Sequence, residues 1–397
     1  MELGRKKTGL TIAALSVAIG SLVFLAPASA DAAHPRPSPS PSPTATPSPP
    51  PPPSPWTIAA SPNPDPYANR LSAIAAVSST DVWAVGSAGA ASLAEHWDGS
   101  TWRVVPTPNP AGSGEQAQLL GVAAINTSDV WAVGFSASPA TDYATLAEHW
   151  NGSAWSIVPT PNPPGVPTVS LNAVAALSAD DIWAVGGNPL DQRNYQGQAL
   201  LEHWNGTAWS IVAAPSSTAT WFASSRFGVA AVATHDVWAT GNYDTFHWDG
   251  TTWSVVQGAQ NALAASALGA AAVWAVGSYT DASYGYSATY TTAYLWNGAG
   301  WTPIATVSPT SGDTFQGVSA RASNDVWAVG SSSASTLTEH WDGNAWKVVA
   351  SADANRATNA YNVLDAVTSI GSSDVWAVGY YFDVAGHQLT LAEHYGG

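Results

Sequence analysis

Cysteine is absent from this 397-residue chain, and charged residues make up only 10% of it. The chain therefore forms no disulfide bond, offers no thiolate to a metal, and cannot carry a lipid anchor on an N-terminal cysteine. Only 11 residues are Lys or Arg, against 27 Asp or Glu. Such an acidic surface repels phosphate backbones and anionic lipid, so nucleic acid and membrane surfaces are poor candidates for partners.

Sequence motifs of the common catalytic and metal sites are also absent. The chain has no nucleophile elbow, phosphate-binding loop, HExxH motif or EF-hand loop. Asp191 and Asp281 could form an acid/base pair, but their separation cannot be read from the sequence. We therefore expect no metal and no cofactor, and the sequence favours a binding protein over an enzyme.

The first 30 residues have the pattern of a signal peptide. A basic segment at residues 5–7 precedes an apolar run from Leu10 to Leu25, and small residues follow at positions 28–30. The run is shorter than the roughly 20 apolar residues of a membrane-spanning helix. We expect cleavage before Asp31, no membrane insertion, and a secreted, extracellular protein that could be associated with the cell wall.

Residues 31–55 are dominated by Pro, Ser, Thr and Ala, a composition that cannot bury a core and favours an extended, disordered linker. Segments of this kind can be O-glycosylated. Loss of the signal peptide removes three basic residues and one acidic residue, which changes the formal net charge from −16 to −18. The folded domain is expected to span residues 56–397.

From residue 56 onward the sequence repeats. The motif Asp-Val-Trp-Ala-Val-Gly, with small variations, occurs seven times, and its copies begin at Asp81, Asp129, Asp181, Asp236, Ala272, Asp325 and Asp374. Each copy lies among four short apolar or alternating runs separated by turn residues, which is typical of a four-stranded antiparallel meander. The spacing predicts an all-β fold, a seven-bladed β-propeller. We name the strands of a blade a to d in chain order, and the motif begins strand b.

The last repeat lacks its strand d, because the sequence stops at Gly397, where the turn between strands c and d is expected. The other six repeats have Asp-Gly or Asn-Gly there, which favours a tight hairpin. The missing strand is found at the start of the domain, where Trp56-Thr-Ile resembles the strand d sequence Trp155-Ser-Ile. We therefore expect the N-terminal strand to complete the last blade and close the ring.

Tryptophan follows the same repeat. The chain has 21 tryptophans, and all except Trp221 fall at recurring positions on strands b, c and d. Each ring can bury on the order of 200 Å² between sheets. The abundance of tryptophan is therefore explained by the framework of the blades.

Residues 56–397 resemble secreted bacterial β-propellers of the kelch and WD-repeat type. Trp97-Asp98 and its equivalents are similar to the WD dipeptide that ends strand c. The Gly-His element of WD repeats and the double glycine of kelch repeats do not recur. The resemblance implies the fold and no particular activity.

A His precedes the last aromatic residue of strand c in six repeats, and the same six repeats have Asp at the start of strand b. The fifth repeat has neither, since Ala272 and Leu295 stand there. The two positions lie side by side in a meander, so we expect hydrogen-bonded pairs that fix the packing of each blade. A metal site or a proton donor is the alternative. The pairs are Asp81 and His96, Asp129 and His149, Asp181 and His203, Asp236 and His247, Asp325 and His340, and Asp374 and His394.

Strand direction places the a-b and c-d turns on one face of the propeller and the b-c loops and d-a connections on the other. We call the second face the variable face, because its loops differ in length and carry aromatic residues outside the repeat. Variable loops on a repeated scaffold usually carry recognition. The candidate ligand-binding residues are Arg193, Tyr195, Trp221, Phe222, Arg226, Tyr284, Tyr286 and Tyr381.

Aromatic rings beside planar hydrogen-bonding side chains suit sugars, although these residues could instead pack within their own loops. We expect an extracellular binding module that recognises carbohydrate or cell-envelope glycan through the variable face. A protein-binding or structural scaffold is the first alternative, and a carbohydrate-active lyase or hydrolase with a central site is the second. The expected partner is a glycan or an extracellular protein, and the chain is expected to be monomeric.

Overall fold

The computed structural model describes residues 55–109, 116–138, 141–166, 168–187, 199–215, 227–242, 244–281, 287–356 and 361–396. The chain divides into two units, Met1–Pro51 and Pro52–Gly397, and the described residues belong to the second. Within these ranges no helix is long and apolar enough to cross a membrane.

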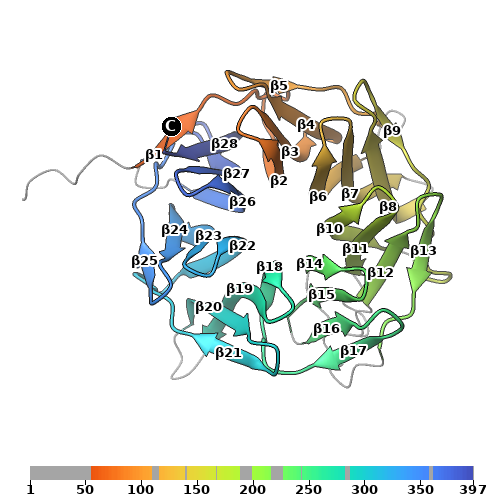
Figure 1. Ribbon diagram of the computed structural model, residues 1–397. Coiled ribbons are helices and arrows are strands. Elements are labelled where there is room, and N and C mark those ends of the chain that lie inside the picture. Colours follow the sequence, from red (N-terminus) through yellow and green to blue (C-terminus); the bar gives the residue numbers. More distant parts are fainter. Residues whose placement is uncertain are drawn as a thin grey trace, which may run out of the picture. The chain divides into compact units, whose positions relative to one another are not determined.

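The second unit is a ring of seven blades around a central channel (Figure 1). Each blade is a four-stranded antiparallel sheet, with strand a innermost and strand d on the outer rim. The predicted all-β, seven-bladed β-propeller is therefore confirmed.

Blade 1 consists of β2 (Asn69–Ser78), β3 (Asp81–Ala88), β4 (Ala91–Trp97) and β5 (Trp102–Val104). Blade 2 consists of β6 (Gln116–Asn126), β7 (Asp129–Ser138), β8 (Thr141–Trp150) and β9 (Trp155–Ile157). Blade 3 consists of β10 (Ser170–Ser178), β11 (Asp181–Gly187), β12 (Ala199–Trp204) and β13 (Trp209–Val212). Blade 4 consists of β14 (Gly228–Ala233), β15 (Asp236–Thr240), β16 (Thr245–Trp248) and β17 (Trp253–Val256).

Blade 5 consists of β18 (Ala262–Gly269), β19 (Ala272–Asp281), β20 (Ala288–Trp296) and β21 (Trp301–Ile304). Blade 6 consists of β22 (Asp313–Ala322), β23 (Asp325–Ser332), β24 (Ser335–Trp341) and β25 (Trp346–Val348). Blade 7 consists of β26 (Asn362–Gly371), β27 (Asp374–Phe382), β28 (Gln388–Tyr395) and the N-terminal strand β1 (Trp56–Ala59).

Blade 7 is assembled from both ends of the domain, as the sequence predicts. Strand β1 lies antiparallel to β28, with Trp56 opposite Tyr395 and Ala59 opposite Ala392 (Figure 1). The hydroxyl of Thr57 also donates a hydrogen bond to the carbonyl oxygen of His394 at 3.2 Å. The ring is thus closed by strand pairing between β1 and β28, which are not joined to each other by the chain.

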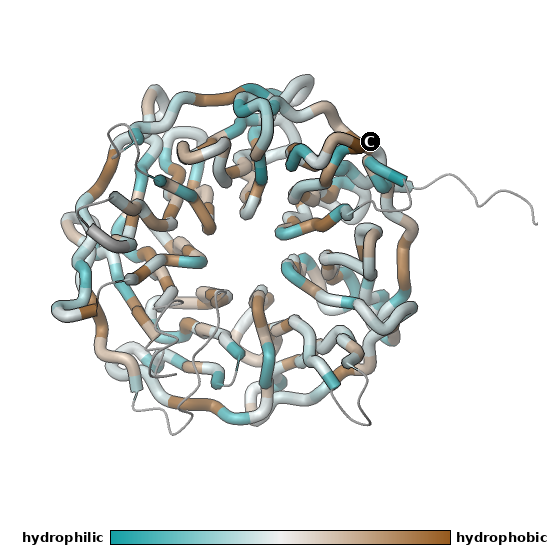
Figure 2. The backbone as a smooth tube through the Cα atoms, turned by 180° about the vertical axis from the view of Figure 1, so that it is seen from behind, coloured by the Kyte–Doolittle hydropathy of each residue, from teal (hydrophilic) through white to brown (hydrophobic). Residues whose placement is uncertain are grey.

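The hydrophobic core lies between neighbouring blades rather than at the centre of the ring, so hydrophobic stretches recur in blade after blade (Figure 2). Trp83 of blade 1 contacts Trp150 and Trp155 of blade 2, with ring centroids 4.9 and 5.3 Å apart. At the closure, Trp327 of blade 6 contacts Tyr395 at 4.7 Å and Trp56 at 5.3 Å. Trp56 and Tyr395 therefore occupy the places that two tryptophans occupy in blade 2.

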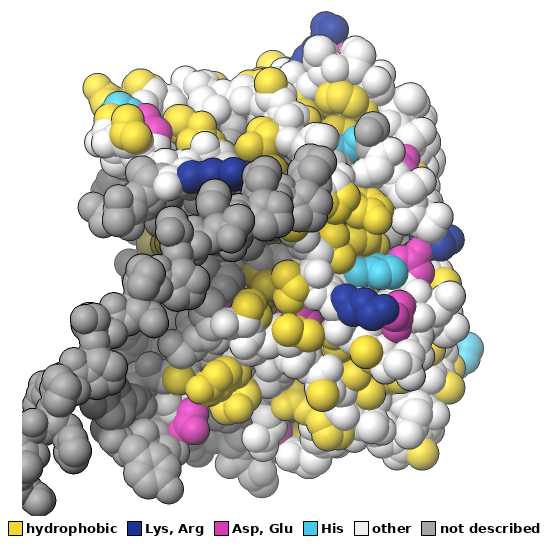
Figure 3. Space-filling view, turned by 90° about the vertical axis from the view of Figure 1, so that its left-hand side faces the viewer, with side chains coloured by type: hydrophobic (Ala, Val, Ile, Leu, Met, Phe, Trp, Pro, Cys, Tyr) yellow, Lys and Arg dark blue, Asp and Glu magenta, His cyan; other side chains and the backbone are white. Residues whose placement is uncertain are grey.

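The outer rim is formed by the strands d, which are three or four residues long. Short edge strands limit pairing with other chains. Charged side chains on the side of the ring seen in Figure 3 are few and scattered among polar and hydrophobic ones. Exposed aliphatic residues recur at the third position of strand d and are Ile58, Val104, Ile157, Ile211 and Val348.

Candidate functional site

Seven of the eight predicted ligand-binding residues lie outside the described residues. They are Arg193, Tyr195, Trp221, Phe222, Arg226, Tyr284 and Tyr286. Tyr381, the eighth, is half-buried on β27 and packs against the core cluster between blades 6 and 7 that contains Trp327. Its burial raises the pKa of the Tyr381 hydroxyl.

The six predicted Asp–His pairs lie within hydrogen-bond distance in the structure. His96 Nε2 is 2.8 Å from Asp81 Oδ1, and the equivalent distances in the other five blades are 2.8 or 2.9 Å. Each His ring also lies against the strand b tryptophan of its blade, as His96 does on Trp83 with centroids 4.4 Å apart. Among the described residues, no group of three or more His, Cys, Asp or Glu could hold a metal ion.

In five blades a Glu precedes this His on strand c, and its environment is different. These residues are Glu95, Glu148, Glu202, Glu339 and Glu393. All five are fully buried, and burial raises the pKa of each carboxyl to about 8. Three of them accept a hydrogen bond from the segment that enters their blade: Glu95 from Ser61 Oγ at 2.7 Å, Glu339 from Val307 N–H and Glu393 from Ala352 N–H, both at 3.2 Å. These carboxyls are protonated at neutral pH and cannot be reached by solvent, and the three that accept a hydrogen bond hold the segment that enters their blade.

Strand a departs from regular pairing near its start, which is the end closest to the variable face. In blade 1, Leu71 pairs with Gly86 and Ala73 pairs with Val85, so Ser72 is an extra residue in a β-bulge. A Cβ atom on Gly86 would overlap the carbonyl oxygen of Arg70, so the glycine that ends the repeated motif makes the bulge possible. Bulges redirect side chains and are common next to functional sites.

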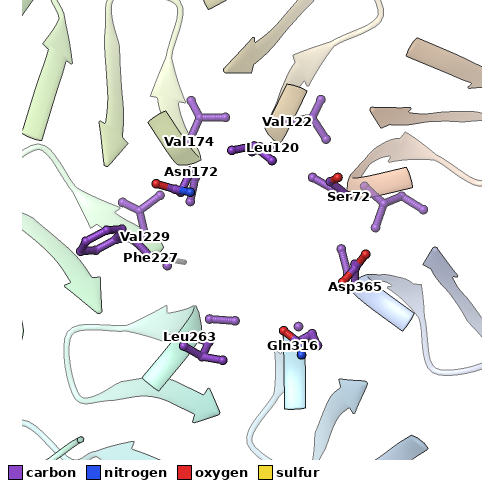
Figure 4. Close-up of a pocket in the computed structure, with 18 of the residues that line it drawn as sticks. Ser72, Leu120, Val122, Asn172, Val174, Phe227, Val229, Leu263, Gln316 and Asp365 are labelled. Carbon is purple, nitrogen blue, oxygen red and sulfur yellow. The ribbon is translucent and has the colours of Figure 1, made fainter. Parts of the chain in front are cut away.

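The same bulge occurs in blades 1, 2, 3, 5, 6 and 7, and it directs one side chain of each blade into the channel (Figure 4). Blade 4 has no such bulge, and Phe227, just before β14, stands at the corresponding point of the chain; it borders the cavity, but its ring packs in the core between blades 3 and 4. We call these seven residues the bulge ring. They are Ser72, Leu120, Asn172, Phe227, Leu263, Gln316 and Asp365. The blades are built alike, yet six residue types occupy this one position.

The bulge ring lines a cavity of about 480 Å³. Two residues further along strand a, a layer of aliphatic side chains lines the same cavity, and all but Ala265 of blade 5 are β-branched. Ile74, Val122 and Val174 belong to this layer, and each is 8% exposed. The cavity thus has a mixed polar and apolar ring at one level and an aliphatic wall at the next.

Arg70 and Asp365 form the charged part of this site. Arg70 Nε lies 2.7 Å from Asp365 Oδ2, and the Asp365 side chain is fully buried. The guanidinium of Arg70 also lies over the ring of Tyr380, 4.7 Å from its centroid. The pair joins blade 1 to blade 7 across the seam where the ring closes, and among the described residues that line the cavity it contributes the only charges.

Aromatic residues of blade 7 gather beside Arg70. The rings of Tyr361, Tyr380 and Phe382 have centroids 5.9 to 6.2 Å apart. Tyr361 is 41% exposed, which leaves part of this group accessible. We call these three residues the aromatic ledge.

Sequence reasoning missed the bulge ring. It placed recognition in the loops, because their length and composition vary, whereas the bulge ring lies within strands that otherwise repeat. A usable signal was present, since the residue after Leu71, Leu119 and Leu171 and its equivalents take six residue types in seven blades, while the neighbouring positions are mostly small or apolar.

No family model and no curated protein matches the chain. Among solved structures, YCF48 from Cyanidioschyzon merolae matches with 17% identity and a TM-score of 0.52, covering 86% of this chain and 98% of that one. YCF48 bound to D1 peptide matches with 14% identity and a TM-score of 0.51, covering 86% and 96%. An α-L-arabinofuranosidase of Fusarium graminearum complexed with arabinobiose reaches 10% identity and a TM-score of 0.48, covering 84% and 95%. Likeness at these identities shows the propeller fold alone, and the resemblance to kelch and WD repeats stays a prediction.

Proposed function

We propose that this chain is an extracellular recognition module that binds carbohydrate at the bulge ring. The observation that carries the proposal is the set of seven side chains, of six residue types, around one cavity of an otherwise repeated scaffold. A repeated structure needs no such variety for its own packing, whereas a ligand with an asymmetric outline does.

Carbohydrate is the ligand class that fits the mixture of groups best. Sugar rings offer hydroxyls for side chains such as Asn172 and Gln316, and their C–H faces suit aromatic and aliphatic surfaces. The aromatic ledge beside Arg70 supplies such a surface next to the cavity. The extracellular location rests on the signal-peptide pattern of residues 1–30.

Recognition of a protein segment is the second candidate. Leu120, Phe227 and Leu263 can seat an apolar side chain of a peptide. YCF48, which shares the fold, is described in complex with a D1 peptide. Glycoside hydrolysis has less support, since it ordinarily uses two carboxylates and Asp365 is the only carboxylate among the described residues of the cavity wall.

A glycan and polysaccharide screen of the whole chain, recording both binding and product release, tests the proposal. Gln316→Ala should weaken binding by about 3- to 10-fold, the effect of one lost hydrogen bond. Gln257→Ala is the matched control, because Gln257 is exposed on the rim beyond β17 and lies outside the cavity. Binding that is weakened by Gln316→Ala and unchanged by Gln257→Ala supports the proposal. Product release makes the protein an enzyme. Absence of binding across the panel overturns carbohydrate recognition.

A further inference from the structure

The bulge ring has two chemically different sides (Figure 4). Three adjacent blades, 6, 7 and 1, contribute what we call the polar arc, namely Gln316, Asp365 and Ser72. The opposite side contributes what we call the apolar arc, namely Leu120, Phe227 and Leu263 of blades 2, 4 and 5, and the amide of Asn172 in blade 3 lies between the first two of them.

The polar arc has hydrogen-bonding capacity that the described residues leave unused. Ser72 Oγ and Gln316 Oε1 are both buried without a hydrogen-bond partner among them. Asp365 lies between these two residues in the ring and is held by Arg70. Buried oxygens in this state are unfavourable, and rotation of either side chain allows its oxygen to meet a ligand hydroxyl in the cavity that both residues line.

The apolar arc offers no hydrogen bond from its side chains. Phe227 is 7% exposed, and the aliphatic layer that includes Val122 and Val229 continues the apolar wall. A ligand hydroxyl directed at Leu120 or Leu263, and away from the Asn172 amide, would lose its hydrogen bonds to water without replacement, which is unfavourable. A methyl group in the same place would be removed from water, which is favourable.

We propose that the bulge ring selects a terminal sugar unit that carries a methyl group, with its hydroxyls on the polar arc and its methyl group against the apolar arc. Both 6-deoxy sugars and N-acetylated sugars have such a group. This inference rests on the proposed function, because it names the ligand class of the same site.

Matched sugars that differ at the methyl-bearing position test this inference by titration of the whole chain. The pairs are D-fucose with D-galactose, L-rhamnose with L-mannose, and N-acetylglucosamine with glucose. The methyl-bearing member of at least one pair should bind about 5- to 20-fold more tightly, the gain expected from burying one methyl group with its close contacts. The pair that shows the preference distinguishes a deoxy sugar from an N-acetylated one.

Substitutions in the apolar arc should remove the preference itself. Leu263→Asn is expected to bring the two sugars within about 2-fold of each other, because the amide can serve the hydroxyl that leucine excludes. Leu268→Asn is the matched control, since Leu268 lies on the same strand β18 near its other end and is 36% exposed. Leu120→Asn in blade 2 repeats the test from a second blade in case the first variant does not fold.

The two levels of inference fail differently. Equal binding of both members of every pair, or a preference that survives in both leucine variants, overturns the methyl-group inference and leaves carbohydrate recognition standing. Absence of binding by every sugar overturns carbohydrate recognition and this inference with it.

Discussion

Within each of six blades, three side chains form a short sequence of contacts: the carboxylate of strand b, the His of strand c and the strand b tryptophan under its ring. The joint replacement of Asp and His in blade 5, by Ala272 and Leu295, made this pairing predictable from the sequence. The neighbouring Glu was not predictable in the same way. Its burial depends on the segment that enters its blade, as the bond from Ser61 to Glu95 shows, and no pattern within one repeat contains that contact.

A double-mutant cycle on Asp81 and His96 measures whether the pair stabilises its blade. We expect a coupling free energy of about 0.5–1.5 kcal/mol between Asp81→Ala and His96→Ala in urea denaturation. Each single substitution leaves the other partner without its hydrogen bond in a partly buried site, where the side chains are 13% and 29% exposed. The double substitution removes both partners and should therefore cost less than the sum.

The control for this cycle combines Asp81→Ala with His149→Ala, which belongs to the pair of blade 2. These two changes should add within about 0.5 kcal/mol, since they share no contact. Strict additivity for Asp81 and His96 as well would contradict a structural role and return the His residues to the list of ligand-binding candidates.

Among the elements, β1 was predictable and the strand a bulge was not. The sequence of β1 matches that of other strands d, and the last repeat lacks one, so its place in blade 7 followed from the repeat. The bulge changes the register of strand a by one residue between Leu71 and Ala73. A one-residue change of register reverses which side chains face the channel, and a simple alternating pattern cannot indicate where it occurs.

A substitution of Trp56 tests whether β1 closes the ring. It is 1% exposed and contacts Trp327 of blade 6 and Tyr395 of its own blade. Trp56→Ala should reduce the free energy of unfolding by about 3–5 kcal/mol, the usual cost of emptying a buried aromatic site. Thermal and urea denaturation of the whole chain would measure the loss.

Ile58→Ala provides the matched control on β1, because Ile58 is 47% exposed and should cost less than about 1 kcal/mol. Deletion of residues 31–50 should likewise leave the melting temperature unchanged, whereas deletion of residues 56–61 should lower it markedly. Equal and negligible effects of the two deletions would rule out closure by β1.

At the scale of the whole molecule, stability is distributed over the seven interfaces between blades, and five of the blades carry one fully buried Glu. Burial raises the pKa of these carboxyls from 4.5 to about 8. Between these values the native state keeps protons that the unfolded chain has released. Their contribution to stability is therefore complete below about pH 4.5 and is lost as the pH rises through 8.

Aspartates in the exposed c-d turns have the opposite effect, because their stabilisation of the folded state decreases as the pH falls. Hydrogen bonds from the side chain of Ser100 and the backbone of Thr101 lower the pKa of Asp98 to about 2, and bonds from the backbone of Thr252 and the side chain of Thr251 lower the pKa of Asp249 to about 2. Their stabilisation is present above about pH 4 and is lost as the pH falls through 2. The propeller should thus be most stable in weak acid, near pH 4–5.

Urea denaturation between pH 5 and 9 tests this expectation. Each buried Glu should decrease the free energy of unfolding by up to about 1.4 kcal/mol per pH unit below its native pKa. Glu202→Gln should reduce the decrease in the free energy of unfolding with pH by the contribution of one carboxyl, because the amide does not ionise. Both oxygens of Glu202 are buried without a partner among the described residues. Asp180→Asn, an exposed change in the same blade, should leave the slope unaltered. A free energy of unfolding that stays level or rises from pH 5 to 8 would mean that these carboxyls are ionised in the folded ring. The interfaces between blades would then have to stabilise buried negative charge. The described contacts of Glu202 offer no hydrogen bond that could do so.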